Sequence, residues 1–144
     1  MKHENLLQTY LANLAVFNVK LHNIHWNVVG KQFMKIHNYT EELYDALFES
    51  YDAVAELLKT KDVFPLSTMS EYLEVATIKE VKATDFSTED SLKMLREDLF
   101  TMRALATDIR NTADKEGDFE TVAMFEDYVA EYSKNIWFVD AMLK

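Results

Sequence analysis

The sequence predicts an all-α protein, a bundle of four long helices with one short extra helix in a long connection. The 144 residues include only two glycines and one proline, whereas sheets and loop-rich folds need more of these turn residues. Apolar residues make up 49% of the chain, and they recur every three or four positions, which is the period of an amphipathic helix. The length suits a single domain, residues 1–144, around one core.

Gly30, Pro65 and Gly117 divide the chain into four long helical segments, near residues 3–29, 32–61, 87–115 and 119–143. Each segment carries its own apolar stripe. The stripes include Leu7, Leu11, Leu14, Phe17, Leu21 and Ile24; Ile36, Leu43, Leu47, Val54 and Leu58; Leu92, Leu95, Leu99, Met102, Leu105 and Ile109; and Val122, Phe125, Val129, Tyr132, Ile136, Val139 and Leu143.

Helix-start signals and connection lengths agree with these segments. Ser87 or Thr88 precedes an acidic first turn, Asp118 is a plausible N-cap, and "LSTMSEYLEVA" predicts a short helix capped by Ser67. The short connections at the two glycines make the flanking helix pairs antiparallel neighbours. The long connection between the second and third helices predicts a crossover of the kind found in ferritin-like bundles.

Composition excludes several classes of protein. Without cysteine there can be no disulfide, thiolate metal site, iron–sulfur cluster or cysteine nucleophile. No stretch approaches the roughly 18 apolar residues of a membrane span, and "MKHENLLQTYLANLAVF" lacks the features of a signal peptide, so we expect a cytoplasmic protein. The net charge of −10 disfavours nucleic acid, which Lys and Arg bind through phosphates, and suits cations.

Three of the four histidines lie in residues 22–56, "HNIHWNVVGKQFMKIHNYTEELYDALFESYDAVAE". On the second helix, His37, Glu41, Asp45, Asp52 and Glu56 fall within an arc of about 100°. Such side chains are suitable ligands for iron, manganese or zinc. Acids four residues apart are more often a solvated helix face, and a lone histidine is more often structural, so the pattern leaves both interpretations open.

Helix length prevents one chain from gathering all of these residues at one site. Glu41 and Asp52 are about 16 Å apart along a helix axis. However, His37 and Glu56 lie symmetrically about residues 46–47, as do Glu41 and Asp52. A two-fold axis at residues 46–47 sets the helix antiparallel to its copy and creates two equivalent sites about 22 Å apart. Ala46 and Leu47 are then expected to pack at the axis.

His25 can join such a site from the first helix. It lies five residues before Gly30, and His37 lies seven residues after it, so antiparallel helices bring the two to similar levels. His22 lies one turn earlier than His25, and we expect it beside the site or at the surface.

The same stretch closely resembles the Dps family of miniferritins, through the frame H-x-x-H-W-x-x-x-G-x-x-F-x-x-x-H, further acids and a D-x-x-x-E pair. "STMSEYLEVATIKE", "TADKEGD" and "KNIW" extend the resemblance over nearly the whole chain, which is most similar to the neutrophil-activating protein branch. The resemblance implies a ferritin-like protomer in a hollow shell of twelve subunits. The shell oxidises Fe(II), preferably with hydrogen peroxide, stores the ferric product and protects against oxidative damage.

Carried over by position, the resemblance assigns His25, His37 and Glu41 of one subunit, with Asp52 and Glu56 of its two-fold partner, to a di-iron or mono-iron ferroxidase centre at the dimer interface. Many members have aspartate in place of Glu41, and the longer carboxylate should still reach. The E-x-x-H signature of di-iron centres inside the bundle is absent, which argues against an intrasubunit centre.

The resemblance also suggests roles outside the ligand set. Trp26 matches a tryptophan beside the site, where it takes up stray oxidising equivalents or serves packing. Trp137 is expected to pack in the core. Asp114 and Asp118 lie in "TADKEGDFE", which resembles the segment lining the three-fold pores through which iron enters. Their other interpretation is helix termination and N-capping.

Two other functions remain open from the sequence. Some Dps members condense DNA, often through a flexible Lys-rich tail, but here the first helix is expected directly after "MKHEN" and the chain ends in "DAMLK". Direct DNA binding is therefore not expected. The third alternative is an immunomodulatory helical oligomer without significant ferroxidase activity.

Overall fold

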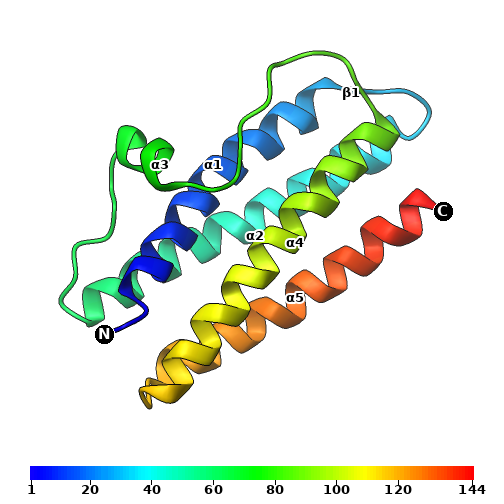
Figure 1. The fold of residues 1–144 in the computed structure, drawn as a ribbon. Helices are drawn as coiled ribbons and strands as arrows, with labels where there is room; N and C mark the ends of the chain where they lie inside the picture. Colours follow the sequence, from blue (N-terminus) through cyan, green and yellow to red (C-terminus); the bar gives the residue numbers. More distant parts are fainter.

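Four long helices form the protein, and the computed structural model describes all of residues 1–144 (Figure 1). The elements, in chain order, are α1 (Glu4–Asn27), β1 (Val28–Val29), α2 (Phe33–Thr60), α3 (Met69–Val75), β2 (Phe86–Ser87), α4 (Thr88–Lys115) and α5 (Phe119–Leu143). The predicted segments are confirmed with shifts of one or two residues at their ends. No helix has both the length and the apolar composition needed to cross a membrane.

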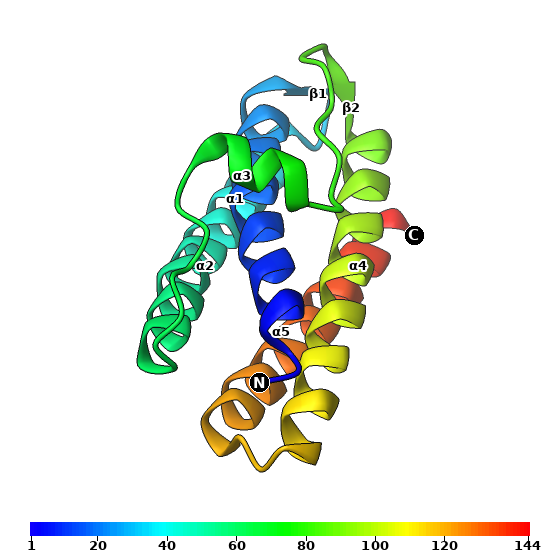
Figure 2. The same ribbon diagram turned by 60° about the vertical axis from the view of Figure 1, so that its left-hand side comes forward.

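The helices form two antiparallel hairpins, α1–α2 and α4–α5, and α1 packs against α4 to join them. The long connection between α2 and α4 crosses the bundle, and its short helix α3 lies against α1 (Figures 1 and 2). The predicted fold, a four-helix bundle with an extra helix in the crossover, is confirmed.

A two-residue parallel ladder ties the end of α1 to the start of α4. Val28 pairs with Phe86, and Val29 pairs with Ser87. This pairing was not predicted, because two residues per strand are too few to leave a periodic pattern. It closes the end of the bundle beside the Gly30 turn, where Gly30 adopts a φ of 117° that favours glycine.

The N-caps of α4 and α5 are the predicted ones. The backbone N–H of Asp90 donates to Ser87 Oγ at 3.0 Å, and Asp118 caps α5 through Thr121. The prediction for α3 is wrong by one residue, because its cap is Thr68 rather than Ser67. The backbone N–H of Glu71, three residues after Thr68, donates to Thr68 Oγ1 at 3.3 Å, as in a capping box, and the Thr68 hydroxyl donates to Glu71 Oε1 at 2.8 Å.

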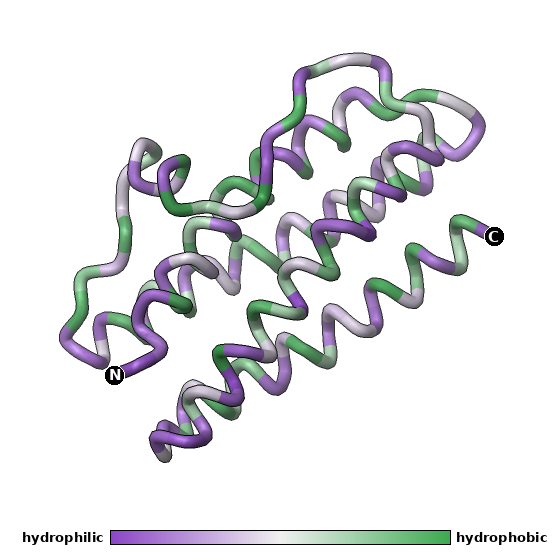
Figure 3. The backbone as a smooth tube through the Cα atoms, in the orientation of Figure 1, coloured by the Kyte–Doolittle hydropathy of each residue, from purple (hydrophilic) through white to green (hydrophobic).

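Hydrophobic and hydrophilic residues alternate along every long helix (Figure 3), and the apolar positions meet in one core of 29 buried residues. Trp137 is not part of it. Its side chain is 65% exposed, so the prediction of core packing is wrong. Trp137 follows the buried Ile136 directly, and one residue turns about 100° around a helix, which carries the indole off the buried stripe.

One ion pair is buried between α1 and α4. Lys20 Nζ lies 2.7 Å from Asp98 Oδ2, and both side chains are almost fully buried. Burial raises the pKa of Asp98, while the neighbouring Lys20 opposes that rise. A charge in this position is tolerated only while its partner remains beside it.

Candidate metal centre

His25 of α1 and His37 of α2 meet face to face beside the Gly30 turn. Their ring centroids are 3.7 Å apart and the rings are inclined by 14°. His25 Nδ1 donates to the backbone carbonyl of His37 at 2.6 Å, and His37 Nδ1 donates to the carbonyl of His25 at 2.8 Å. Phe33 stacks on the other side of His37, with centroids 5.1 Å apart. The two imidazoles are thus locked to each other's helix.

This lock determines which nitrogens can bind a metal. A carbonyl only accepts hydrogen bonds, so each Nδ1 carries the proton and each neutral ring keeps its lone pair on Nε2. Metal-binding histidines are commonly oriented in this way, with the second nitrogen donating to a carbonyl or a carboxylate. Burial lowers the pKa of His25, which favours the neutral form that a metal requires.

Glu41 completes one group of candidate ligands. Its Oε1 lies 3.9 Å from His25 Nε2, which is too far for a hydrogen bond. The ring of Tyr44 stands edge-on to His25, with centroids 5.3 Å apart. The structure therefore brings His37 into contact with His25 and places Glu41 near His25, at the N-terminal part of α2.

Asp52 and Glu56 form a second group, further along α2. The side chain of Asp52, one turn earlier, raises the pKa of Glu56 through hydrogen bonding and through its charge. Within one chain the structure holds no group of three or more His, Asp or Glu side chains placed to bind a metal ion. The chain presents two separate groups, and it does not bring all five predicted ligands together.

An exposed aromatic ring lies between the two groups. Phe48 is 60% exposed, and at about 20° from His37 around the helix it shares the face of the candidate ligands. The expectation that Leu47 packs at a two-fold axis is wrong, because Leu47 is buried in the core of its own chain. Leu47 lies on the stripe that faces α1, whereas Phe48 faces away from it.

His22 and Trp26 lie beside the first group rather than in it. His22 Nδ1 donates to the carbonyl of Asn18 at 2.7 Å, and its ring stacks on Tyr44 with centroids 3.8 Å apart. Trp26 contacts His22 at 5.5 Å between centroids and is 67% exposed. Trp26 therefore does not pack in the core of its own chain.

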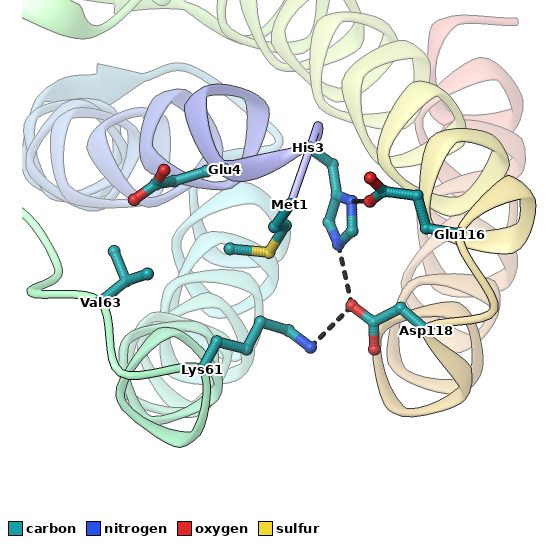
Figure 4. Close-up of a pocket in the computed structure, with 7 residues that line it drawn as sticks. All are labelled: Met1, His3, Glu4, Lys61, Val63, Glu116 and Asp118. Atoms are coloured by element: carbon teal, nitrogen blue, oxygen red, sulfur yellow. Dashed lines mark hydrogen bonds and ion pairs between the residues drawn. The ribbon is translucent and has the colours of Figure 1, made fainter.

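Asp118 lies among charged partners that the sequence did not reveal (Figure 4). His3 Nε2 donates to Asp118 Oδ2 at 2.8 Å, and Lys61 Nζ lies 2.7 Å from the same oxygen. Burial alone would raise the pKa of Asp118, but hydrogen bonds from Lys61, Thr121 and His3 outweigh it and hold that pKa well below its usual range. The N-cap interpretation of Asp118 is confirmed.

His3 connects the N-terminus to the α4–α5 turn. The His3 side chain is 1% exposed. Its Nδ1 lies 2.7 Å from Glu116 Oε2, but the angles at this contact are not those of a hydrogen bond. A carboxylate oxygen thus lies within 2.8 Å of each nitrogen of the ring. Its only sequence signal was its place just before the first helix. Asp114, by contrast, is exposed and lies 3.6 Å from Arg110 Nη1.

Comparisons with known proteins agree on one family. A model of the ferritin-like domain matches residues 4–144. The chain is 36% identical over 143 residues to the DNA protection during starvation protein of Helicobacter pylori, covering 99% of each protein. It superposes on the crystal structure of Helicobacter cinaedi CAIP with a TM-score of 0.94 and 34% identity, covering 96% of this chain and 97% of that one.

A third match concerns metal chemistry. The crystal structure of the Vibrio cholerae Dps protein, described as a member of a broad superfamily of ferritin-like diiron-carboxylate proteins, has a TM-score of 0.94 and 34% identity, with coverage of 99% of this chain and 89% of that one.

Proposed function

This chain belongs to the Dps branch of the ferritin-like family, and from that premise we propose that it is a miniferritin with ferroxidase activity. Acting in the cytoplasm as a single ferritin-like domain, it oxidises Fe(II), preferably with hydrogen peroxide. It stores the ferric product in a hollow homo-oligomeric shell of twelve subunits and so protects against oxidative damage. The observation that carries this proposal is the reciprocal pair of hydrogen bonds between His25 and His37, which leaves both Nε2 lone pairs free, that of His25 at 3.9 Å from Glu41.

Each site is shared between two copies of the chain. One copy provides His25, His37 and Glu41, and the other provides Asp52 and Glu56. Support comes from their symmetric spacing along α2 and from the exposed Phe48 between the two groups, an apolar surface that an antiparallel second copy would cover. An isologous two-fold contact makes this exchange reciprocal, so a dimer has two equivalent sites.

The residue types suit the oxidation of iron. Imidazole and carboxylate ligands bind Fe(II), and the hard carboxylates favour the more highly charged Fe(III). Because Asp52 raises the pKa of Glu56, a proton competes with the metal ion for the Glu56 carboxylate. Two Fe(II) ions give two electrons to one hydrogen peroxide, which takes up two protons and leaves as two water molecules. Delivering both electrons at one place avoids release of a hydroxyl radical.

Residues around the site support secondary roles. Trp26, exposed and in contact with His22, is placed to take up stray oxidising equivalents. Asp114 and Asp118 are proposed to line the pore through which iron enters. Asp114 is exposed and supports this role directly, whereas Asp118 is already paired with Lys61 and His3 and contributes mainly by shaping the turn.

The test is an anaerobic Fe(II) titration followed by addition of peroxide. We expect the wild type to bind Fe(II) and oxidise it rapidly, and the His25→Ala/His37→Ala variant to lose both properties. Asn38→Ala, at an exposed position next to His37, is the matched control and should behave as wild type. A double variant that binds and oxidises Fe(II) at the wild-type rate would refute the assignment, as would a monomeric wild type in light scattering.

A DNA-condensing role is the second candidate, because the Helicobacter pylori relative is named for DNA protection. The net charge of −10 argues against direct binding, since non-specific affinity depends on neutralising phosphates. We expect no retardation of duplex DNA in a low-salt gel-shift experiment. Retardation that disappears with added salt would favour the nucleoid role. The immunomodulatory alternative has no supporting contact in the structure.

A further inference from the structure

The buried stripe of α2 contains a single polar side chain. Its buried residues are Ile36, Thr40, Leu43, Leu47, Val54, Leu57 and Leu58. Thr40 is fully buried at 0% exposure. A valine would fill the same volume without the cost of removing a hydroxyl from water. The contacts of the Thr40 hydroxyl therefore have to compensate for its burial.

The Thr40 hydroxyl contacts both candidate ligand histidines, His25 and His37. Thr40 Oγ1 donates to the carbonyl of Ile36 at 2.8 Å and lies 3.0 Å from the carbonyl of His37. With its proton used in this way, the oxygen retains lone pairs, and His25 Nδ1 approaches it at 3.1 Å. The N–H of His25 is thus shared between the His37 carbonyl and the Thr40 hydroxyl. No other α2 side chain forms a hydrogen bond with the ring of His25.

We propose that Thr40 is a positioning residue for His25, an inference that rests on the proposed ferroxidase site. Its hydroxyl is a second acceptor for the Nδ1 proton. It fixes both the tautomer and the rotation of the imidazole, so that Nε2 faces Glu41. Thr40 touches no metal itself and acts only through His25.

The expected effect follows from what remains when the hydroxyl is removed. The His37 carbonyl still accepts from Nδ1 at 2.6 Å, so the ring loses one of two acceptors and gains rotational freedom. Loss of such supporting groups weakens metal binding by about 10–100-fold, and with one acceptor left we expect a loss near the lower limit, about tenfold. The Fe(II) KM should rise by a similar factor, while kcat at saturating Fe(II) stays within about twofold, because the ligands themselves remain.

The experiment uses Co(II), which reports its ligands through visible absorption, titrated into the assembled protein. Thr40→Val removes the hydroxyl and keeps the shape. Thr40→Ser and Thr40→Ala both lack the methyl group, and they differ from each other only in the hydroxyl. We expect Ser to bind Co(II) like the wild type, and Val and Ala to bind about tenfold more weakly. Thr107→Val is the matched control, because Thr107 donates to a carbonyl one turn earlier on α4 at 2.8 Å and contacts no candidate ligand.

The outcomes separate this inference from the proposed function. If Thr40→Val binds Co(II) as tightly as the wild type, or if Thr40→Ser is as weak as Thr40→Ala, the hydroxyl does not position His25 and the inference is overturned, while the ferroxidase site stands. If wild-type Co(II) binding is unaffected by His25→Ala/His37→Ala, the site assignment fails and the inference falls with it. Should Thr40→Val not assemble, the difference in Co(II) affinity between Thr40→Ser and Thr40→Ala decides whether the hydroxyl is needed.

Discussion

His25 and His37 each donate Nδ1–H to the other's backbone carbonyl, at 2.6 and 2.8 Å, across the interface of α1 and α2. Each ring is therefore held by the helix that carries the other, and neither can turn without breaking its own hydrogen bond to that helix. Because packing and hydrogen bonds already fix both rings, little conformational freedom would be lost on binding the proposed metal ion.

Glu56→Gln should stabilise the metal-free protein but weaken its binding of Fe(II). The folded-state pKa of Glu56 is raised, first by its hydrogen bond with Asp52 and then by the charge of Asp52. A raised carboxyl pKa favours folding below the unfolded pKa and costs stability above the folded one. The amide should therefore raise the Tm of the metal-free protein at about pH 8 and leave it unchanged in acid, below about pH 4, while weakening Fe(II) binding. Thermal melts of metal-free protein across this range check the sign, and a lower Tm at about pH 8 would contradict it.

Lys20→Met should destabilise the bundle strongly. The change leaves Asp98 buried without its partner at 2.7 Å, and such a loss costs about 3–5 kcal/mol. Because burial already raises the pKa of Asp98, this carboxyl takes up a proton readily once the lysine is gone, and the defect should shrink as the pH falls. Lys20→Met/Asp98→Leu should recover most of the stability.

The measurement is urea unfolding, with Lys93→Met as control. Lys93 pairs with Glu89 on the exposed surface and should change stability by less than about 1 kcal/mol. Equal effects at the two lysines would show that the Lys20 pair is no more important than a surface contact.

His3→Gln should alter the acid dependence of stability. The hydrogen bond from the Lys2 backbone, and the nearby His3, lower the pKa of Glu116, and His3 is one of the groups that lower the pKa of Asp118. Lowered carboxyl pKa values give stability that is present above the unfolded values, about 4, and is lost as the pH falls through the folded ones. The wild type should therefore exceed His3→Gln in stability at neutral pH and approach it below about pH 4.

Melts of both proteins from neutral to acid pH provide the test. The double variant His3→Gln/Glu116→Gln should lose less than the sum of the two single losses, because the residues act on each other. A difference between wild type and His3→Gln that stays constant with pH would mean that the ring contributes packing alone.

The sequence could predict the fold because the apolar period repeats over many turns of every long helix, and because Ser87 and Asp118 are strong local start signals. It failed where one residue or a contact distant in sequence decides the outcome. Trp137 faces outward one residue after the buried Ile136, and Thr68 rather than Ser67 has its glutamate at the right spacing.

For the candidate site, too, the sequence predicts some features and not others. Spacing alone indicated that His25 and His37 lie at one level, and that Asp52 lies too far along α2 to join them in the same chain. Spacing could not indicate the exchange of hydrogen bonds with backbone carbonyls, the Thr40 hydroxyl beneath His25, or the contact of His3 with a turn more than one hundred residues away. These depend on side-chain rotamers and on helix packing.

Each proposed site needs residues from two chains, and mixed assemblies test this requirement most directly. The His25→Ala/His37→Ala variant and the Asp52→Ala/Glu56→Ala variant should each be inactive alone. In a dimer containing one of each, one site lacks all four residues and the other is complete. Co-expression with two different tags, followed by purification on both, yields assemblies that contain both chains. Random pairing should then restore ferroxidase activity to about a quarter of wild type. Mixed assemblies no more active than the separate variants would contradict a shared site.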